Sequence, residues 1–164
     1  MPKATIIEVP TAAEVVADLQ AKGSEPVRKI YIKQGNGEKI IGVKMGDLRS
    51  IATRLKKQHA LGLALWDTGW FEARVLATML LVPRELSEAE CIRLAESCDS
   101  SAIIDKLTGY VLADTQHPAA LRGRWLDEGD PLLGRAGWNL MTEAVKADKQ
   151  GALDLDAILA RVEA

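Results

Sequence analysis

The sequence predicts an all-α protein in which antiparallel helix pairs stack into an array. Apolar residues recur at helical spacing along most of the 164 residues, as amphipathic helices require. Capping residues and prolines mark about nine or ten helix starts separated by short turns. Strand signals are almost absent. The exception is KIIGVK at residues 39–44, which is too short to form the basis of a sheet. Stacked pairs form curved arrays with a concave binding face, and a compact irregular bundle is the alternative.

Five predicted helices occupy the first half of the chain. They are predicted from apolar residues at helical spacing, in most cases together with a signal that starts or stops a helix. They are residues 12–19 after the Thr11–Glu14 capping box, the segment from Ser24 to Tyr31 with Pro26 in its first turn, 47–58, 60–66 before Thr68–Gly69, and 70–81. The last is nearly all apolar, so we expect it at the centre of the fold.

Further helix starts follow in the second half. Capping side chains satisfy the unpaired N–H groups of a first turn, and proline removes one of them. These signals stand at Ser87–Glu90, at Ser100 or Ser101 for a helix running to about Ala113, at His117–Pro118, at Asp130–Pro131 and at Asp154. The last helix carries an apolar face of Leu155, Ile158, Leu159 and Val162.

Length and composition suit one globular domain over residues 1–164. No apolar run approaches the roughly 18 residues of a membrane span, and the N-terminus lacks the layout of a secretion signal. Cys91 and Cys98 lie on one face of a predicted helix, which is more typical of core positions than of a redox pair. We therefore expect a cytoplasmic monomer with reduced cysteines.

Charge is distributed unevenly along the chain. The total is −2, but residues 28–57 hold nine basic residues and two acids, a net charge of +7 that leaves −9 elsewhere. Such a positive field attracts phosphate backbones, whereas lysine-rich helix faces can also serve solubility alone. The residues expected to contact DNA, with Lys44 and Arg49 foremost, are Lys33, Lys39, Lys44, Arg49, Arg54, Lys57 and Arg122.

Motifs for metal sites, phosphate loops and nucleophile elbows are missing from the sequence. GNGEKIIG at residues 35–42 has three glycines but lacks the strand–loop–helix frame, so it predicts a loop. His59 and His117 have no ligand partners nearby, which favours a turn residue and a helix cap over acid–base chemistry. We expect neither a metal nor a cofactor, and a small-molecule enzyme has no motif in its support.

Asp105 and Arg135 each lie inside an otherwise apolar helix. A charge there must be paired, hydrogen-bonded or placed in a cleft. If the two helices are neighbours, the pair is either a salt bridge that fixes packing, or a site where the carboxylate stabilises a developing cation and the arginine holds a phosphate. The four tryptophans, Trp66, Trp70, Trp125 and Trp138, have aliphatic neighbours that favour packing over base stacking.

Three motifs are specific when taken together and in order: GVKMGDLR at residues 42–49, LWDTGWFEAR at 65–74 and RAGW at 135–138. With the surrounding sequence from about residue 31 to 141, they resemble the DNA alkylation repair family. The resemblance implies an all-helical array of HEAT-like repeats that binds double-stranded DNA on a basic concave face. It also implies that the DNA is alkylated.

The resemblance further implies an activity, since characterised family members are DNA glycosylases. They remove cationic alkylated purines such as 3-methyladenine and 7-methylguanine. By motif, the family's aspartate, which stabilises the oxocarbenium-like sugar and positions water, falls on Asp105. The arginine that contacts the DNA backbone falls on Arg135. Because alkylation already makes the base a good leaving group, electrostatic stabilisation is the main requirement.

Two departures from the family pattern favour an alternative. Residues 100–104, SSAII, stand where the glycosylases carry tryptophan before the aspartate. Relatives continue for several helices past the position of Ala164, so we expect a shortened member or a fragment. The primary hypothesis is a DNA-binding protein that excises alkylated purines. The alternative is a HEAT-like scaffold without catalysis that binds protein or structured nucleic acid.

Overall fold

The computed structural model describes residues 8–163, and every regular element in that range is helical. The helices, with two short 3-10 turns, are α1 (Ala12–Lys22), α2 (Glu25–Lys33), α3 (Met45–Leu55), α4 (His59–Asp67), α5 (Phe71–Leu80), η1 (Pro83–Glu85), α6 (Glu88–Glu96), α7 (Ser101–Tyr110), η2 (Leu112–Asp114), α8 (Pro118–Trp125), α9 (Pro131–Ala147) and α10 (Leu155–Glu163). The predicted all-α class is confirmed. None of the helices in this range is long and apolar enough to cross a membrane.

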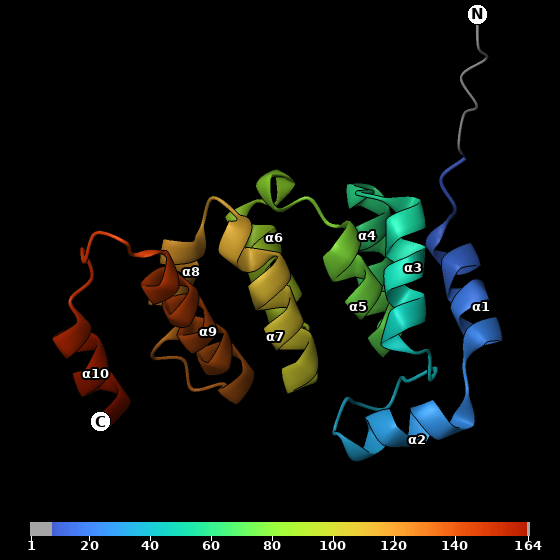
Figure 1. Cartoon of the computed structure of the whole chain (residues 1–164), viewed down its shortest axis with the longest axis horizontal. Helices are drawn as coiled ribbons and strands as arrows, with labels where there is room; N and C mark the ends of the chain where they lie inside the picture. Colours follow the sequence, from blue (N-terminus) through green and yellow to red (C-terminus); the bar gives the residue numbers. More distant parts are fainter. Residues whose placement is uncertain (1–7, 164) are drawn as a thin grey trace, which may run out of the picture.

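The helices follow one another in chain order from α1 at one end of the molecule to α10 at the other (Figure 1). α3, α5, α7 and α9 contact each other in succession, and we call them the four-helix layer. α4 packs against α5, and α8 packs against α9. Each pair contacts its neighbours along the array, which is how helical repeat proteins bury a continuous core.

Most local start signals operate as predicted, but the side chains of Ser24 and His117, which precede α2 and α8, form no capping hydrogen bond. The Thr11 hydroxyl accepts the N–H of Glu14 (3.2 Å), and the Glu14 carboxylate accepts the N–H of Thr11 (2.8 Å). Ser87 forms the same capping box ahead of α6. Proline is the first residue of α8 and of α9, and the Asp130 side chain caps α9. Helix starts are local events, so the sequence suffices to place them.

Helix ends depart from the prediction. The helix expected over residues 47–58 spans Met45–Leu55, because Lys56 adopts a φ of 59° that ends α3. Cys98 lies beyond the end of α6, which contains Cys91, so the prediction that they share one helix is wrong. Burial raises the pKa of Cys91 to about 11 and that of Cys98 to about 12. Both thiols therefore stay protonated at neutral pH.

The core runs through the middle of the array. α5 is mostly buried, as its apolar sequence predicts. Trp66 and Trp125 are fully buried, which confirms the packing interpretation for these two, whereas Trp70 and Trp138 are half-buried. Gly137 allows α8 to approach α9 closely, because a Cβ at this position would lie 2.8 Å from the backbone carbonyl carbon of Trp125. This explains the glycine of the RAGW motif.

Candidate functional site

The structure brings Asp105 and Arg135 together on the four-helix layer. Arg135 of α9 donates two parallel hydrogen bonds to Asp105 of α7, from Nε to Oδ1 at 2.6 Å and from Nη2 to Oδ2 at 2.8 Å. Asn139 adds a third bond, from Nδ2 to Oδ1 at 2.8 Å. A bidentate arginine–carboxylate pair fixes the orientation of both groups. The carboxylate is therefore held in one position relative to α9.

Short-range signals explain why these side chains meet. Ser100 caps α7 and Asp130 caps α9, which places Asp105 and Arg135 in the second turns of two adjacent helices. Asn139 follows Arg135 by one helical turn and so shares its face. Sequence reasoning missed Asn139, although the i,i+4 spacing was visible in the sequence.

The Asp105–Arg135 pair is accessible to solvent. The Asp105 side chain is 39% exposed and that of Arg135 is 51% exposed. A shallow depression of about 230 Å³ opens beside the carboxylate. The residues that line it carry mostly polar side chains, and they are Asp105, Thr108, Gly109, Asn139, Thr142, Glu143 and Lys146. The predicted salt bridge between Asp105 and Arg135 therefore exists, and it lies beside an open depression rather than in the core.

The hydrogen bonds from Arg135 lower the pKa of Asp105, and partial burial opposes this only in part. The same bonds raise the pKa of Arg135. Asp105 is thus a carboxylate at neutral pH. A carboxylate whose pKa is depressed in the folded state stabilises that state above its unfolded pKa, and loses this contribution as the pH falls through the folded value.

Asp105→Asn is therefore expected to have a pH-dependent effect on stability. The free energy of unfolding should differ from wild type by a constant amount from pH 7 down to about 5, and the difference should shrink below pH ~4, where the wild-type carboxyl protonates. Urea unfolding of both proteins across this pH series measures it. A difference that stays constant down to pH ~2.5 would show that Asp105 gains nothing from Arg135 in the folded state.

Two of the predicted DNA-contacting residues lie on the same layer as Asp105. Arg49 of α3 and Lys57 line a hollow of about 330 Å³, together with Thr78 and Met79 of α5 and Tyr110 of α7. Lys57 Nζ also donates to the Leu81 carbonyl oxygen at 2.8 Å. This hollow connects α3 to α7, the helix that carries Asp105. The hollow and the depression beside Asp105 thus share helix α7.

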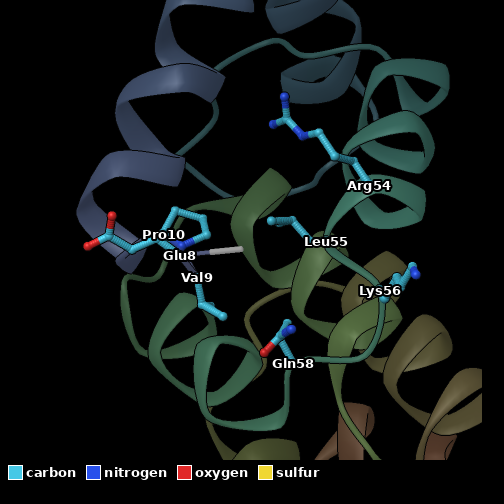
Figure 2. Close-up of a pocket in the computed structure, with 7 residues that line it drawn as sticks. All are labelled: Glu8, Val9, Pro10, Arg54, Leu55, Lys56 and Gln58. Carbon is cyan, nitrogen blue, oxygen red and sulfur yellow. The ribbon is translucent and has the colours of Figure 1, made fainter. Parts of the chain in front are cut away.

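The other predicted DNA-contacting residues lie elsewhere. Arg54 approaches Asp18 of α1 at 3.7 Å and lines a separate cavity of about 370 Å³ at the N-terminal end of the array (Figure 2). Arg122 of α8 lines a smaller cavity against the end of α9. Lys39 donates to the Thr68 carbonyl oxygen at 3.0 Å. Lys33 is at the end of α2 and Lys44 immediately precedes α3, both exposed.

Residues 39–44, which we call the strap, connect α2 to α3 without forming a regular element. The carboxylate of Glu72 on α5 is fully buried beneath them. It accepts the backbone N–H groups of Ile41 (3.0 Å), Gly42 (2.6 Å) and Val43 (3.2 Å). Glu72 thereby ties the strap to the central helix. Sequence reasoning missed this residue, although it too is a charge within an apolar helix.

The strap carbonyls are paired as well. Arg28 Nε donates to Ile40 O and the Tyr31 hydroxyl donates to Val43 O, each at 3.0 Å. Gly42 has a φ of 96° and lies so close to α2 that a Cβ there would come within 2.3 Å of the Ser24 carbonyl oxygen. Only glycine fits this position. The motifs at residues 42–49 and 65–74 therefore meet at Glu72, and these positions within them are structural.

The side chains of His, Cys, Asp and Glu within residues 8–163 do not gather in groups of three or more that could hold a metal ion. His59 serves locally instead, since its Nδ1 accepts the N–H of Val82 at 3.2 Å.

Comparisons with known proteins agree with this architecture. The sequence profile described as DNA alkylation repair enzyme matches residues 15–164. A solved structure described as a new family of proteins related to the HEAT-like repeat DNA glycosylases, with affinity for branched DNA structures, superposes with a TM-score of 0.79 and 25% sequence identity. The match covers 92% of this chain and 64% of that chain, so this chain spans just under two thirds of that length. No curated protein matches the sequence.

Proposed function

Because the chain belongs to the DNA alkylation repair enzyme family, we propose that it binds DNA across the four-helix layer, with a branched or distorted duplex as its preferred partner. The carrying observation is the hollow in which Arg49 and Lys57 reach α7, the helix that also lines the depression beside Asp105. Cations on one surface can contact successive phosphates of one duplex, and such contacts supply most of non-specific DNA affinity.

Further cations extend this surface along the array. Lys106 of α7 places its Nζ 5.8 Å from the centre of the Tyr110 ring, which is itself 55% exposed. Lys146 of α9 lines the depression beside Asp105. Its Nζ forms an ion pair with the Glu143 carboxylate, at 2.8 Å from Oε1. The cations thus run from α3 to α9, the span of the layer.

Branched or distorted DNA is favoured as the partner for two reasons. The similar solved structure belongs to proteins described as having affinity for branched DNA. In addition, residues 100–104, SSAII, precede Asp105 where the glycosylases of the resembled family carry tryptophan. Without that indole, the surface lacks an aromatic contact to a single damaged nucleotide. Contacts to DNA phosphates do not require the indole and are retained.

Removal of two layer cations tests this proposal. The double variant Arg49→Ala/Lys57→Ala is expected to lower DNA affinity about tenfold and to reduce the slope of log K against log salt by about 2, because each lost phosphate contact removes close to one unit. Fluorescence anisotropy with labelled duplex and three-way junction between 50 and 200 mM salt measures both quantities.

The matched control is Arg54→Ala/Arg84→Ala, which removes the same charge from the α1 side and from η1. Its affinity should stay within about twofold of wild type. Equal losses in the two double variants would mean that net charge, rather than the layer surface, drives binding. Lack of binding by wild type at 50 mM salt would refute the proposal.

Excision of alkylated purines is the second candidate function. The favouring observation is the solvent-accessible, ionised carboxylate of Asp105 on α7. When the bond between C1′ and an alkylated purine breaks, its electron pair stays on the base and neutralises it, while positive charge develops on the sugar. A fixed carboxylate stabilises that charge until water adds to C1′ and releases a proton. Arg135 and Asn139 hold the carboxylate still, which lowers the cost of reorganisation.

A further inference from the structure

Helix α2 differs from the other helices in how it is attached. It lies across the ends of α3 and α5 at the edge of the array rather than alongside them (Figure 1). Arg28 and Tyr31 anchor its inner face through their hydrogen bonds to the strap carbonyls. The Tyr31 ring also packs on Phe71 of α5, with ring centroids 5.3 Å apart. The anchor is therefore made by polar groups and one aromatic contact.

The outer face of α2 carries Pro26, Lys29, Ile30 and Lys33 at helical spacing. All four are exposed, and Ile30 is exposed by 53%. None of the nine residues of α2, all of them described by the structure, is buried. Packing within the described residues therefore does not explain why Ile30, an apolar side chain, lies between Lys29 and Lys33.

The charges around Ile30 are suited to a phosphate backbone. Lys29 and Lys33 lie one turn apart, with Cβ atoms about 6 Å from each other, and flank the apolar side chain. The acid of this helix, Glu25, is engaged by Arg28 at 3.8 Å. The exposed outer face is thus an apolar side chain framed by cations.

We propose that this face of α2 engages the branch point of a DNA junction, with Ile30 packed against an exposed base pair and the two lysines on the adjacent phosphates. The proposal rests on the DNA-binding function proposed above and names the structural feature that would be recognised. Proteins that kink DNA insert apolar side chains such as isoleucine between base pairs and must disrupt stacking to do so. At a branch the stacking is already interrupted, so the same contact forms at lower cost than in a continuous duplex.

Ile30→Ser tests this assignment, with Ile32→Ser as its matched control. Ile32 is also exposed, at 43%, but two residues of α-helix turn it about 160° away from Ile30. Both positions are on the surface, so both variants should fold, which circular dichroism and thermal unfolding verify. Affinity is measured for a three-way junction and for a continuous duplex of the same sequence, with 2-aminopurine at the branch as a stacking probe.

Ile30→Ser is expected to weaken junction binding about tenfold while leaving duplex binding within twofold. The fluorescence change of 2-aminopurine on binding should disappear in Ile30→Ser and persist in Ile32→Ser. Unchanged affinity for both DNAs in Ile30→Ser would overturn the proposal and favour a protein partner for this face. Equal weakening on both DNAs would also overturn it, by reducing α2 to a general DNA contact. Lack of DNA binding by wild type would instead refute the proposed function.

Discussion

Asp105→Asn is expected to lower the release of methylated purine from alkylated duplex DNA about 100-fold, the typical cost of removing one electrostatic group that stabilises a transition state. Asparagine has nearly the same shape and can still accept a hydrogen bond from Arg135, so the fold and DNA affinity should be retained. What is lost is the negative charge opposite the developing cation on the sugar. Chromatographic quantification of 3-methyladenine and 7-methylguanine against time measures the effect.

The control for this variant is Asp114→Asn, an exposed aspartate of the turn η2. Its release rate should equal that of wild type. Equal rates above background in wild type and Asp105→Asn would show that excision occurs without this carboxylate. Background release from every protein, combined with intact DNA binding, would leave the chain as a DNA-binding member of its family without base excision.

Glu72→Ala is expected to destabilise the protein by about 3–5 kcal/mol, a large fraction of the stability of a single domain. The substitution removes a fully buried carboxylate and leaves the N–H groups of residues 41–43 without their acceptor. Each buried donor left unpaired costs about 1–3 kcal/mol. The cavity created by the shorter side chain adds to this loss.

Urea unfolding followed by circular dichroism measures the change, and Glu85→Ala serves as the matched control. Glu85 is an exposed glutamate in η1, so its removal should change the unfolding free energy by less than about 0.5 kcal/mol. A loss of under about 1 kcal/mol for Glu72→Ala would mean that water replaces the carboxylate beneath the strap, and that the strap is not held by Glu72.

Helix starts could be predicted from sequence, whereas some helix ends could not. The capping boxes at Thr11 and Ser87 act within one turn of chain, so their effect is independent of tertiary contacts. The end of α3 instead depends on Lys56 adopting a positive φ, which no residue-type rule predicts for lysine. The prediction for Cys98 is wrong because no glycine or proline signal marks the end of α6 at Ser97.

The candidate site shows a similar division. A charge inside an apolar helix singled out Asp105 and Arg135, and the fold pairs them. The same rule applies to Glu72, which is fully buried, while Asp105 is exposed by more than a third. Periodicity within one helix does not tell a buried carboxylate from an exposed one, because the difference is set by the segment that covers it.

Basic residues that are clustered in the sequence can lie on different surfaces of the fold. Arg49 and Arg54 belong to one basic stretch, yet five residues of α-helix rotate the second by about 140° from the first. Arg49 accordingly faces α7, whereas Arg54 faces Asp18 of α1. The net charge of the stretch predicted affinity for phosphate, and helical geometry decides which of its members share a surface.

The strap has a consequence for behaviour in concentrated solution. Its sequence, KIIGVK, is the most strand-like in the chain, and an extended apolar segment with free N–H groups is a template on which other chains can build cross-β aggregates. Here the N–H groups of residues 41–43 are occupied by a carboxylate and not by a neighbouring strand. An approaching chain finds no hydrogen-bonding edge to extend. One buried acid thus shields from self-association the segment most prone to it.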